Sequence, residues 1–246
     1  MILAAAQIKS IEQNTDANLD KHYKLVDLAA QYGVQLIVFP EMSITGYERE
    51  PGNELAFSMD HHRHSRLRNL ADLHNMVIIA GAPVKIDDKL FIGSFIYMPG
   101  KETALYTKQY LHDGEKKFYS PNPNYNPVLD LEDQRISLAI CADIANPNHS
   151  ANASANNSTL YLASLFYTPG GIGEAYDQLN SYARKYSMNV LMSNYTGSSY
   201  RFESAGKSAF WNKEGELVAK LDEKTEGLLI VERKNENWLS KVIALS

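Results

Sequence analysis

The sequence predicts an α/β fold with parallel strands, and two observations carry that prediction. The first is a strand–helix–strand unit: an apolar run over residues 2–8, apolar residues at helical spacing from Leu19 to Ala30, and a second apolar run over 34–39. The second is an apolar run over 136–140 that leads directly into helix-starting residues. Such runs are typical of strands buried on both faces, and a helix between two of them is typical of parallel pairing.

Length and composition suit one large α/β domain. The chain has 246 residues, of which 44% are hydrophobic and 22% charged, and no domain boundary stands out. We therefore expect a single domain over residues 1–246. The net charge of −5 gives no sign of nucleic-acid binding. No apolar run approaches the roughly 20 residues of a membrane span, so we expect no membrane partner.

The N-terminus and the cysteine content favour a cytoplasmic location. Residues 1–7 lack a basic leader and a long apolar core, so they do not resemble a signal peptide. Cys141 is the only cysteine, so no internal disulfide can form, which fits a reducing compartment.

The first half of the chain is predicted to extend the sheet. Asn14 to Asp16 supply capping oxygens for the first helix, and Gly33 ends it. Further strands are expected over residues 76–82, 91–98 and 103–107, the first two joined by a turn at 87–88.

Residues 60–74 contain a run of histidines and arginines. Their spacing fits no standard metal-ligand pattern, and no thiol lies near. We interpret the run as the solvated face of a helix, with Leu67, Leu70 and Leu73 turned inward.

The second half alternates loops, helices and strands. Residues 108–127 are predicted to form a long irregular loop, a kind of segment that is commonly functional. Residues 148–158 are small and polar and are interpreted as a weak crossover helix, and Gly170–Gly173 as a plain turn. A helix is expected over 174–186, and strands over 160–166, 189–193, 208–211, 217–220 and 227–232.

Cys141 occupies a position that suits a nucleophile. The run 136–140 ends there, Asn146 can cap a helix, and Pro147 suits its first turn. The thiol should therefore project from the carboxyl end of a strand beside a helix N-terminus, where a thiolate forms more easily. A lone cysteine is more often a small buried apolar side chain, so partners are needed.

Glu41 and Lys108 are the partners that the sequence offers. Each follows a predicted strand, as Cys141 does, and strand ends of like direction converge on one rim of a sheet. Taken singly, a surface glutamate and an extended surface lysine are the commoner interpretations.

Three stretches together resemble the catalytic motifs of the nitrilase superfamily of carbon–nitrogen hydrolases: Phe39–Glu41, Lys108–Leu111 and Ile140–Asp143. Their order and spacing agree with that family, and the resemblance runs from residue 2 to about 232. Further matches are Gly46-Tyr47, Glu115 with Phe118 and Pro121, Asn194 with Gly197, Gly206–Ser208 and Asn212–Gly215. The resemblance implies a four-layer αββα sandwich of two mixed sheets.

The resemblance also implies a chemistry without metal or cofactor. Cys141 would attack an amide or nitrile carbon, with Glu41 as general base. Lys108 and the backbone N–H of Ala142 would stabilise the oxyanion, and Glu115 would hold Lys108 in its charged state. A thioester on Cys141 would then be hydrolysed.

Departures from the family pattern bear on the substrate. Ala142 is smaller than the usual residue, Ile144 and Ala145 stand where a polar side chain is usual, Tyr110 replaces a frequent histidine, and Asn148 replaces a frequent glutamate. Without an obvious arginine, a carboxylate-bearing substrate is disfavoured. We expect a pocket lined by apolar and aromatic groups, with Tyr47, Ala142, Phe166, Tyr167 and Asn194 as substrate-binding residues.

Asp143 favours an amidase, because nitrilases of this family tend to have glutamate at that position. A nitrilase, an acyltransferase, and a catalytically silent binding module on the same scaffold stay open as alternatives. The expected partner is a small amide or nitrile, and family members commonly form dimers through their outer helices, so a homo-oligomer is expected.

Overall fold

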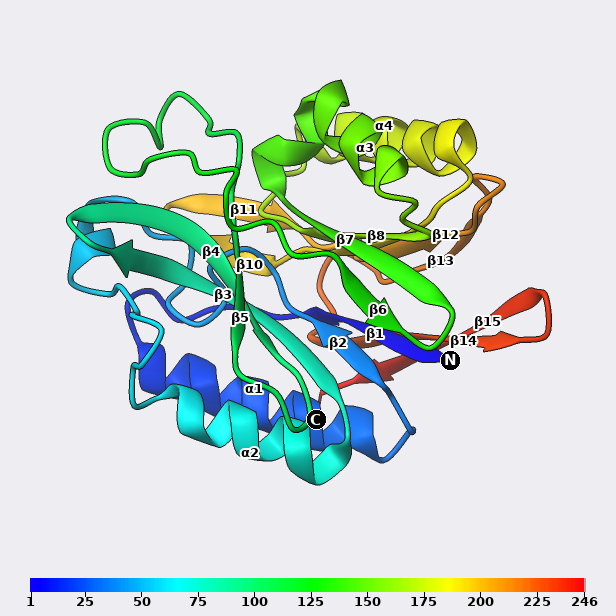
Figure 1. Cartoon of the computed structure of the whole chain (residues 1–246), viewed down its shortest axis with the longest axis horizontal. Helices are drawn as coiled ribbons and strands as arrows, with labels where there is room; N and C mark the ends of the chain where they lie inside the picture. The colour runs from blue at the N-terminus through cyan, green and yellow to red at the C-terminus, as the bar shows by residue number, and fades with distance from the viewer. Residues whose placement is uncertain (246) are drawn as a thin grey trace.

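The structure, a computed structural model, describes residues 1–245 and contains two β-sheets packed face to face, with helices on both outer faces (Figure 1). One mixed sheet has seven strands and the other has six. The prediction of an α/β fold with a four-layer αββα sandwich is therefore confirmed.

The seven-stranded sheet follows the order β15-β14-β1-β2-β3-β4-β5. Its central strands β1, β2 and β3 are parallel, and the outer strands are antiparallel. In chain order the strands are β1 (Ile2–Gln7), β2 (Leu36–Val38), β3 (Val77–Ile86), β4 (Lys89–Tyr97), β5 (Ala104–Thr107), β14 (Gly227–Lys234) and β15 (Asn237–Ala244).

Helices α1 (Thr15–Ala30) and α2 (His64–His74) cover the outer face of this sheet (Figure 1). Asn14 caps α1 by accepting a hydrogen bond from the N–H of Ala17 at 3.1 Å, as predicted. Each helix packs its apolar face against the sheet. In α1 the buried residues of this face include Leu19, Leu25 and Val26.

The predicted inward face of α2 is only partly right. Leu67 and Leu70 are buried, but Leu73 is 73% exposed. The buried face of α2 runs through His64, Leu67, Leu70 and Ala71, and at about 100° per residue Leu73 points away from it. His64 is buried and bonds to the Tyr97 hydroxyl at 2.7 Å, so this histidine is structural. Within residues 1–245 no cluster of three or more His, Cys, Asp or Glu side chains is arranged to hold a metal.

The six-stranded sheet follows the order β13-β12-β9-β8-β7-β6, with β7, β8 and β9 parallel. Its strands are β6 (Leu129–Leu131), β7 (Gln134–Ile140), β8 (Leu160–Ser164), β9 (Asn189–Ser193), β12 (Ala209–Trp211) and β13 (Leu217–Lys220). Helices α3 (Pro147–Ala155) and α4 (Ile172–Tyr186) cover its outer face (Figure 1). The predicted weak crossover helix is thus confirmed as α3.

The sequence did not predict four of the strands. Besides β6 and β15, these are β10 (Thr196–Ser199) and β11 (Phe202–Ala205), which form a two-stranded sheet of their own. These segments are short or carry few buried apolar residues, so the hydrophobic alternation that marks a strand is weak in them.

The inner faces of the two sheets approach closely at β1. Ala4, Ala5 and Ala6 are fully buried, and because side chains alternate between the faces of a strand, these small residues let the layers on both sides of β1 approach it closely. The Ser193 hydroxyl of β9 donates to Ala6 O at 2.6 Å, and the Ser208 N–H donates to Gln7 Oε1 at 2.9 Å. These bonds fix the sheets relative to each other and so fix the distance between strand ends that belong to different sheets.

None of the helices within residues 1–245 combines the length and the hydropathy that crossing a membrane requires.

Candidate active site

Three buried charged side chains meet where β2 and β5 end. The Lys108 ammonium donates to Glu41 Oε1 at 2.6 Å and to Glu115 Oε1 at 2.7 Å, and all three side chains are fully buried. Glu41 lies just beyond β2, Lys108 follows β5, and Glu115 lies in the loop after it. Tyr195, which follows β9 of the other sheet, donates its hydroxyl to Glu41 O at 2.6 Å and so anchors this corner.

Cys141 lies at the carboxyl end of β7, in a sharp turn with a φ of 41°. A positive φ is unusual for a non-glycine residue and is found at strained, functional turns. A short 3₁₀ helix, Cys141–Ala145, follows, and then Asn146 caps α3 by accepting from the Asn148 N–H at 3.0 Å. The predicted order of strand, sharp turn and capped helix is confirmed.

The thiol of Cys141 lies close enough to the three charged groups for their charges to act on it. Glu41, Lys108 and Glu115 all contribute to the pKa of the thiol. The thiol is 2% exposed and has two polar contacts, to Phe166 O at 3.7 Å and to His112 Nε2 at 3.3 Å.

The expectation that the thiolate forms easily is wrong for the resting protein. Burial raises the pKa of the Cys141 thiol well above its usual value, Glu41 raises it further, and Lys108 offsets only part of the increase. The first residue of α3 is Pro147, beyond the 3₁₀ turn, so the helix N-terminus does not compensate for the burial. The resting group is therefore a thiol, and it needs a base.

The two carboxylates that share Lys108 have different surroundings. Glu115 accepts from Lys108, from the Tyr47 hydroxyl at 2.6 Å and from the His112 N–H at 2.9 Å. Glu41 accepts only from Lys108 through Oε1, and its buried Oε2 has no hydrogen-bond partner within residues 1–245. The anionic form is thus much better stabilised on Glu115 than on Glu41.

The pKa values follow this difference. Burial raises the pKa of Glu41 to about 7, although Lys108 opposes the shift. Burial also raises the pKa of Glu115, but Lys108 and the hydrogen bonds outweigh it and leave the pKa below the usual value. Burial lowers the pKa of Lys108, yet the two carboxylates outweigh it and keep the ammonium charged. Glu41 is therefore the member that titrates near neutrality, which suits a general base.

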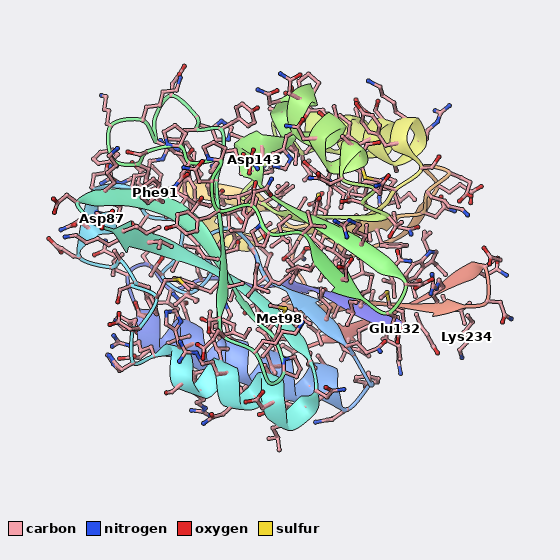
Figure 2. All side chains as sticks on the ribbon, in the orientation of Figure 1. Asp87, Phe91, Met98, Glu132, Asp143 and Lys234 are labelled. Atoms are coloured by element: carbon pink, nitrogen blue, oxygen red, sulfur yellow. The ribbon has the colours of Figure 1, made fainter. Side chains whose placement is uncertain are left out.

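Asp143 ties the turn of Cys141 to the chain around Lys108. Its Oδ2 accepts from the Ile140 N–H at 2.8 Å and from the Tyr106 hydroxyl at 2.6 Å. Its Oδ1 accepts from the N–H groups of Gln109 at 3.0 Å and Tyr110 at 2.9 Å. Figure 2 shows Asp143 between the irregular loop and α3. Four donors on one buried carboxylate fix the relative position of two sheets' strand ends.

Three of the predicted substrate-binding residues gather beside the sulfur. The Tyr47 ring stacks on Phe166 with centroids 4.6 Å apart, and its hydroxyl reaches Glu115. Phe166 offers its carbonyl oxygen to the thiol. Tyr167 follows Phe166 directly in the chain and is half-buried.

Ala142 and Asn194 have different positions. Ala142 is buried next to the sulfur in the 3₁₀ turn. The Asn194 side chain bonds only to main-chain atoms, accepting from the Tyr167 N–H at 2.9 Å and donating to Gly206 O at 2.8 Å and Tyr167 O at 3.3 Å. In this arrangement Asn194 acts on the site by fixing the main chain at Tyr167.

Two side chains at the site were not predicted from the sequence. His112 lies against the sulfur, and Arg49 donates to the Tyr47 hydroxyl at 3.1 Å and 3.3 Å while packing against Gly114. The sequence placed His112 in a loop of functional type, but nothing in the pattern showed which loop side chain faces the thiol.

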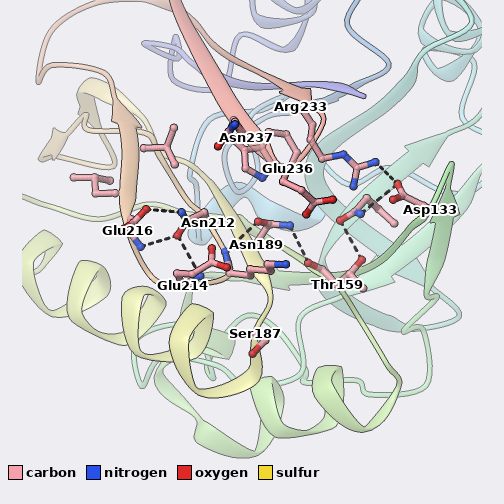
Figure 3. A pocket seen from close by; sticks show the side chains of 15 residues that line it. Asp133, Thr159, Ser187, Asn189, Asn212, Glu214, Glu216, Arg233, Glu236 and Asn237 are labelled. Atoms are coloured by element: carbon pink, nitrogen blue, oxygen red, sulfur yellow. Dashed lines mark hydrogen bonds and ion pairs between the residues drawn. The ribbon is translucent and has the colours of Figure 1, made fainter.

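A separate cavity of about 510 Å³ lies at the other end of the parallel strands of the six-stranded sheet (Figure 3). It is lined by residues that begin or precede strands, such as Gln134, Thr159 and Asn189. Figure 3 shows mainly polar side chains there, with an ion pair between Arg233 and Asp133. Neither the three buried charged groups nor Cys141 lines this cavity, so it is separate from the site described above.

Comparison with known proteins identifies the family. The family model described as carbon-nitrogen hydrolase matches residues 2–239. A nitrilase from Pyrococcus abyssi is 31% identical over 132 residues, which cover 52% of this chain and 50% of that protein. A glutamine-dependent NAD(+) synthetase from Thermotoga maritima is 24% identical over 225 residues, covering 87% of this chain and 38% of that protein. The chain thus spans half or less of the length of these two relatives.

Solved structures agree with the fold. The NitN amidase from Nesterenkonia sp. AN1 superposes with a TM-score of 0.85 at 22% identity, over 96% of this chain and 93% of that one. A mutant of the same amidase in complex with acrylamide gives a TM-score of 0.87 at 21% identity, over 96% and 91% of the two chains. Since the family model extends over nearly the whole sequence and the fold agrees with these structures, the chain belongs to the carbon–nitrogen hydrolase family, the nitrilase superfamily that its three motifs resemble.

Proposed function

We propose that this protein is an amidase that cleaves the C–N bond of a small amide and releases ammonia through a thioester on Cys141. One observation carries the proposal. A buried ammonium, Lys108, is shared by two carboxylates of unequal basicity beside a buried thiol. This arrangement pairs a nucleophile with a base near neutral pKa and with a cation that can stabilise an oxyanion.

The first step is attack on the amide. Glu41 takes the thiol proton as the sulfur bonds to the carbonyl carbon, and the carbonyl oxygen becomes an oxyanion. The Lys108 ammonium and the N–H of Ala142 stabilise that oxyanion, each donor contributing on the order of 3 kcal/mol. Glu41 has a pKa of about 7, so it is a stronger base than an ordinary carboxylate while still partly ionised at neutral pH.

The second step expels ammonia, and the third restores the thiol. Protonated Glu41 gives its proton to the departing nitrogen as the C–N bond breaks, which leaves the thioester. Glu41 then takes a proton from water, whose oxygen attacks the thioester carbon. Collapse of that intermediate breaks the C–S bond, releases the carboxylic acid and returns a proton to the sulfur.

In this scheme the other site residues bind the substrate or position the reacting groups. Glu115 keeps Lys108 charged and directed at the oxyanion. Tyr47, Phe166 and Tyr167 line the acyl part of the substrate with aromatic groups, and Ala142 leaves space beside the sulfur. Asn194 holds the main chain at Tyr167 through its three hydrogen bonds.

The names of the relatives support the choice of test substrates. The solved amidase has been crystallised with butyramide and with acrylamide. One curated relative is a nitrilase and another is a glutamine-dependent synthetase. A panel of butyramide, glutamine and butyronitrile therefore separates a small amide, an amino-acid amide and a nitrile.

The test measures ammonia release from each compound together with the intact mass of the protein. Ammonia from butyramide or glutamine and an acyl adduct on Cys141, both absent in Cys141→Ala, support the amidase. Release from butyronitrile alone supports a nitrilase, and faster acyl transfer to hydroxylamine than to water supports an acyltransferase. If no compound reacts and iodoacetamide does not label the thiol, the binding module is the better interpretation.

We also propose a single domain that forms a homo-oligomer through its outer layer, where α3 and α4 lie (Figure 1). Light scattering on the purified chain measures the mass, and a monomer at micromolar concentration would contradict this proposal. A cytoplasmic location is proposed on the sequence alone, and cell fractionation tests it.

A further inference from the structure

One side chain at the sulfur has no part in the scheme above. The ring of His112 lies against the thiol, with Nε2 3.3 Å from Cys141 Sγ. Within residues 1–245 the sulfur has two hydrogen-bonding contacts, and the contact to His112 is shorter than the one to Phe166 O. Any ligand that reaches the sulfur must do so beside this ring.

The position of His112 is fixed by the residue that holds Lys108. The His112 N–H donates to Glu115 Oε2 at 2.9 Å, and the Glu115 N–H donates back to His112 O at 2.9 Å. These two bonds close a tight turn over residues 112–115. The turn that directs Glu115 at Lys108 therefore also places the imidazole on the sulfur.

The direction of the contact depends on the state of the sulfur. In the thiol, the single S–H can be directed at Phe166 O, 3.7 Å away, or at His112 Nε2, 3.3 Å away, and the role of the ring nitrogen depends on its tautomer. When the thiol proton has left, the sulfur has no donor, and only a ring that carries an Nε2–H keeps the contact.

The groups around the ring keep it neutral. Burial lowers the pKa of His112, and Lys108 and Arg49 lower it further, while Glu115 and Asp113 oppose them. A neutral imidazole has one N–H, and the tautomer that carries it on Nε2 is the one that donates to a thiolate at this position.

We propose that His112 is a catalytic residue that donates Nε2–H to the Cys141 thiolate and stabilises it during attack. The proton balance is simple: the S–H bond of Cys141 breaks, an O–H bond forms on Glu41, and His112 keeps its own proton throughout. The inference rests on the proposed nucleophilic role of Cys141, but it does not depend on which amide is cleaved.

The test compares the wild type with His112→Phe, which keeps a ring of similar size but removes the N–H, and with His112→Gln, which keeps an N–H donor. The rate of Cys141 alkylation by iodoacetamide is measured from pH 7 to 11.5, because burial raises the pKa of the thiol well above its usual value. The thiolate is the reactive form, so the pH at which the alkylation rate is half its maximum reports the stability of the thiolate. How accessible the sulfur is changes the maximum rate and not this midpoint. His62→Phe, at an exposed histidine away from the site, is the matched control.

A hydrogen bond to an ionised acceptor contributes enough to change an equilibrium by roughly 10- to 100-fold. His112→Phe should therefore move the alkylation midpoint upward by about one to two pH units, with kcat/KM for the amide falling about 10-fold or more. His112→Gln should recover part of both, and His62→Phe should change neither.

The alkylation midpoint separates this inference from the amidase proposal. An unchanged midpoint in His112→Phe overturns the role of His112 even if the wild type hydrolyses butyramide. A raised midpoint supports that role even if no amide in the panel is cleaved. If His112→Gln shifts the midpoint as far as His112→Phe, the N–H is not the group that matters, and the inference is wrong.

Discussion

The hydroxyl of Tyr106 donates a 2.6 Å hydrogen bond to Oδ2 of Asp143. Tyr106 lies in β5, two residues before Lys108, and Asp143 lies two residues after Cys141. The contact therefore joins a strand of one sheet to the turn at the end of a strand of the other. It helps to fix the distance between Lys108 and Cys141, which approach from opposite sheets.

Replacing Asp143 should weaken the fold and the site together. In the wild type both carboxylate oxygens of Asp143 accept hydrogen bonds. In Asp143→Asn one of these oxygens is replaced by an NH₂ group, which cannot accept from the donors that face it. We expect a loss of about 3 kcal/mol in the free energy of unfolding, because buried donors lose an ionised acceptor. For a chain of this size that is a fall in Tm of roughly 6–12 °C. Asp113→Asn, at an exposed carboxylate of the irregular loop after β5, should leave Tm unchanged within about 1 °C.

The two carboxylates that share Lys108 should respond differently to amide substitution. Glu41→Gln removes the base and should lower kcat by about 10²–10⁴-fold. Glu115→Gln removes an acceptor of three hydrogen bonds and should lower the free energy of unfolding by more than Glu41→Gln does at neutral pH. Steady-state kinetics and urea unfolding of both variants check this. Equal activity losses with Glu41→Gln the less stable would contradict the assigned roles.

The rate of amide hydrolysis should rise with pH through about 7. Burial raises the pKa of Glu41 to about 7 against the opposing charge of Lys108, and the base acts only when ionised. A plot of kcat/KM against pH from 5 to 9 should therefore show an ascending limb with its midpoint within about one unit of 7. A midpoint near 4.5 would mean that Glu41 has an ordinary pKa and that the desolvation inferred from its burial is absent.

Much of this site could be predicted from local patterns. Glu41, Lys108 and Cys141 each follow a strong apolar run, and the strands and the sharp turn were found because strand ends are local features. Strands of like direction end at one rim of a sheet, which accounts for Glu41 and Lys108 in the seven-stranded sheet. Cys141 ends a strand of the other sheet, so its approach to them depends on how the two sheets pack.

The features that the sequence did not predict depend on the environment after folding. The thiol pKa moved opposite to expectation because burial, which no local pattern reports, outweighs nearby charge. His112 and Arg49 reach the site from irregular segments, where no periodicity gives the direction of a side chain. Leu73 was placed inward by its residue type alone, although the helix turns it to solvent.

Removing the Tyr47 hydroxyl should impair catalysis without unfolding the protein. Tyr47 donates to Glu115 at 2.6 Å and accepts from Arg49, so Tyr47→Phe deprives Glu115 of one donor and leaves the Arg49 guanidinium without its acceptor. We expect kcat/KM to fall about 10-fold, in line with the loss of one hydrogen bond to a charged group. Tyr200→Phe removes an exposed hydroxyl that bonds Glu50 and is the control. Equal kinetics for the two variants would show that Tyr47 contributes only its ring.

The stability of Glu41→Gln relative to the wild type should depend on pH in a direction fixed by the raised pKa. Glu41 has a pKa of about 7 in the folded protein against 4.5 as an ordinary value, so between these the folded state holds more protons than the unfolded state. The contribution of Glu41 is therefore fully present below pH 4.5 and is lost as the pH rises through 7.

Glu41→Gln has no such titration. Its free energy of unfolding minus that of the wild type should rise by up to about 3 kcal/mol from pH 4.5 to 8. Glu115→Gln is the matched control, because the pKa of Glu115 is lowered in the folded protein and its contribution changes only at more acidic pH. Urea unfolding at pH 5, 6, 7 and 8 measures both differences. A difference for Glu41→Gln that stays constant, or that falls with pH, would show that the folded protein does not hold a proton on Glu41, and the choice of this carboxylate as the base would lose its thermodynamic support.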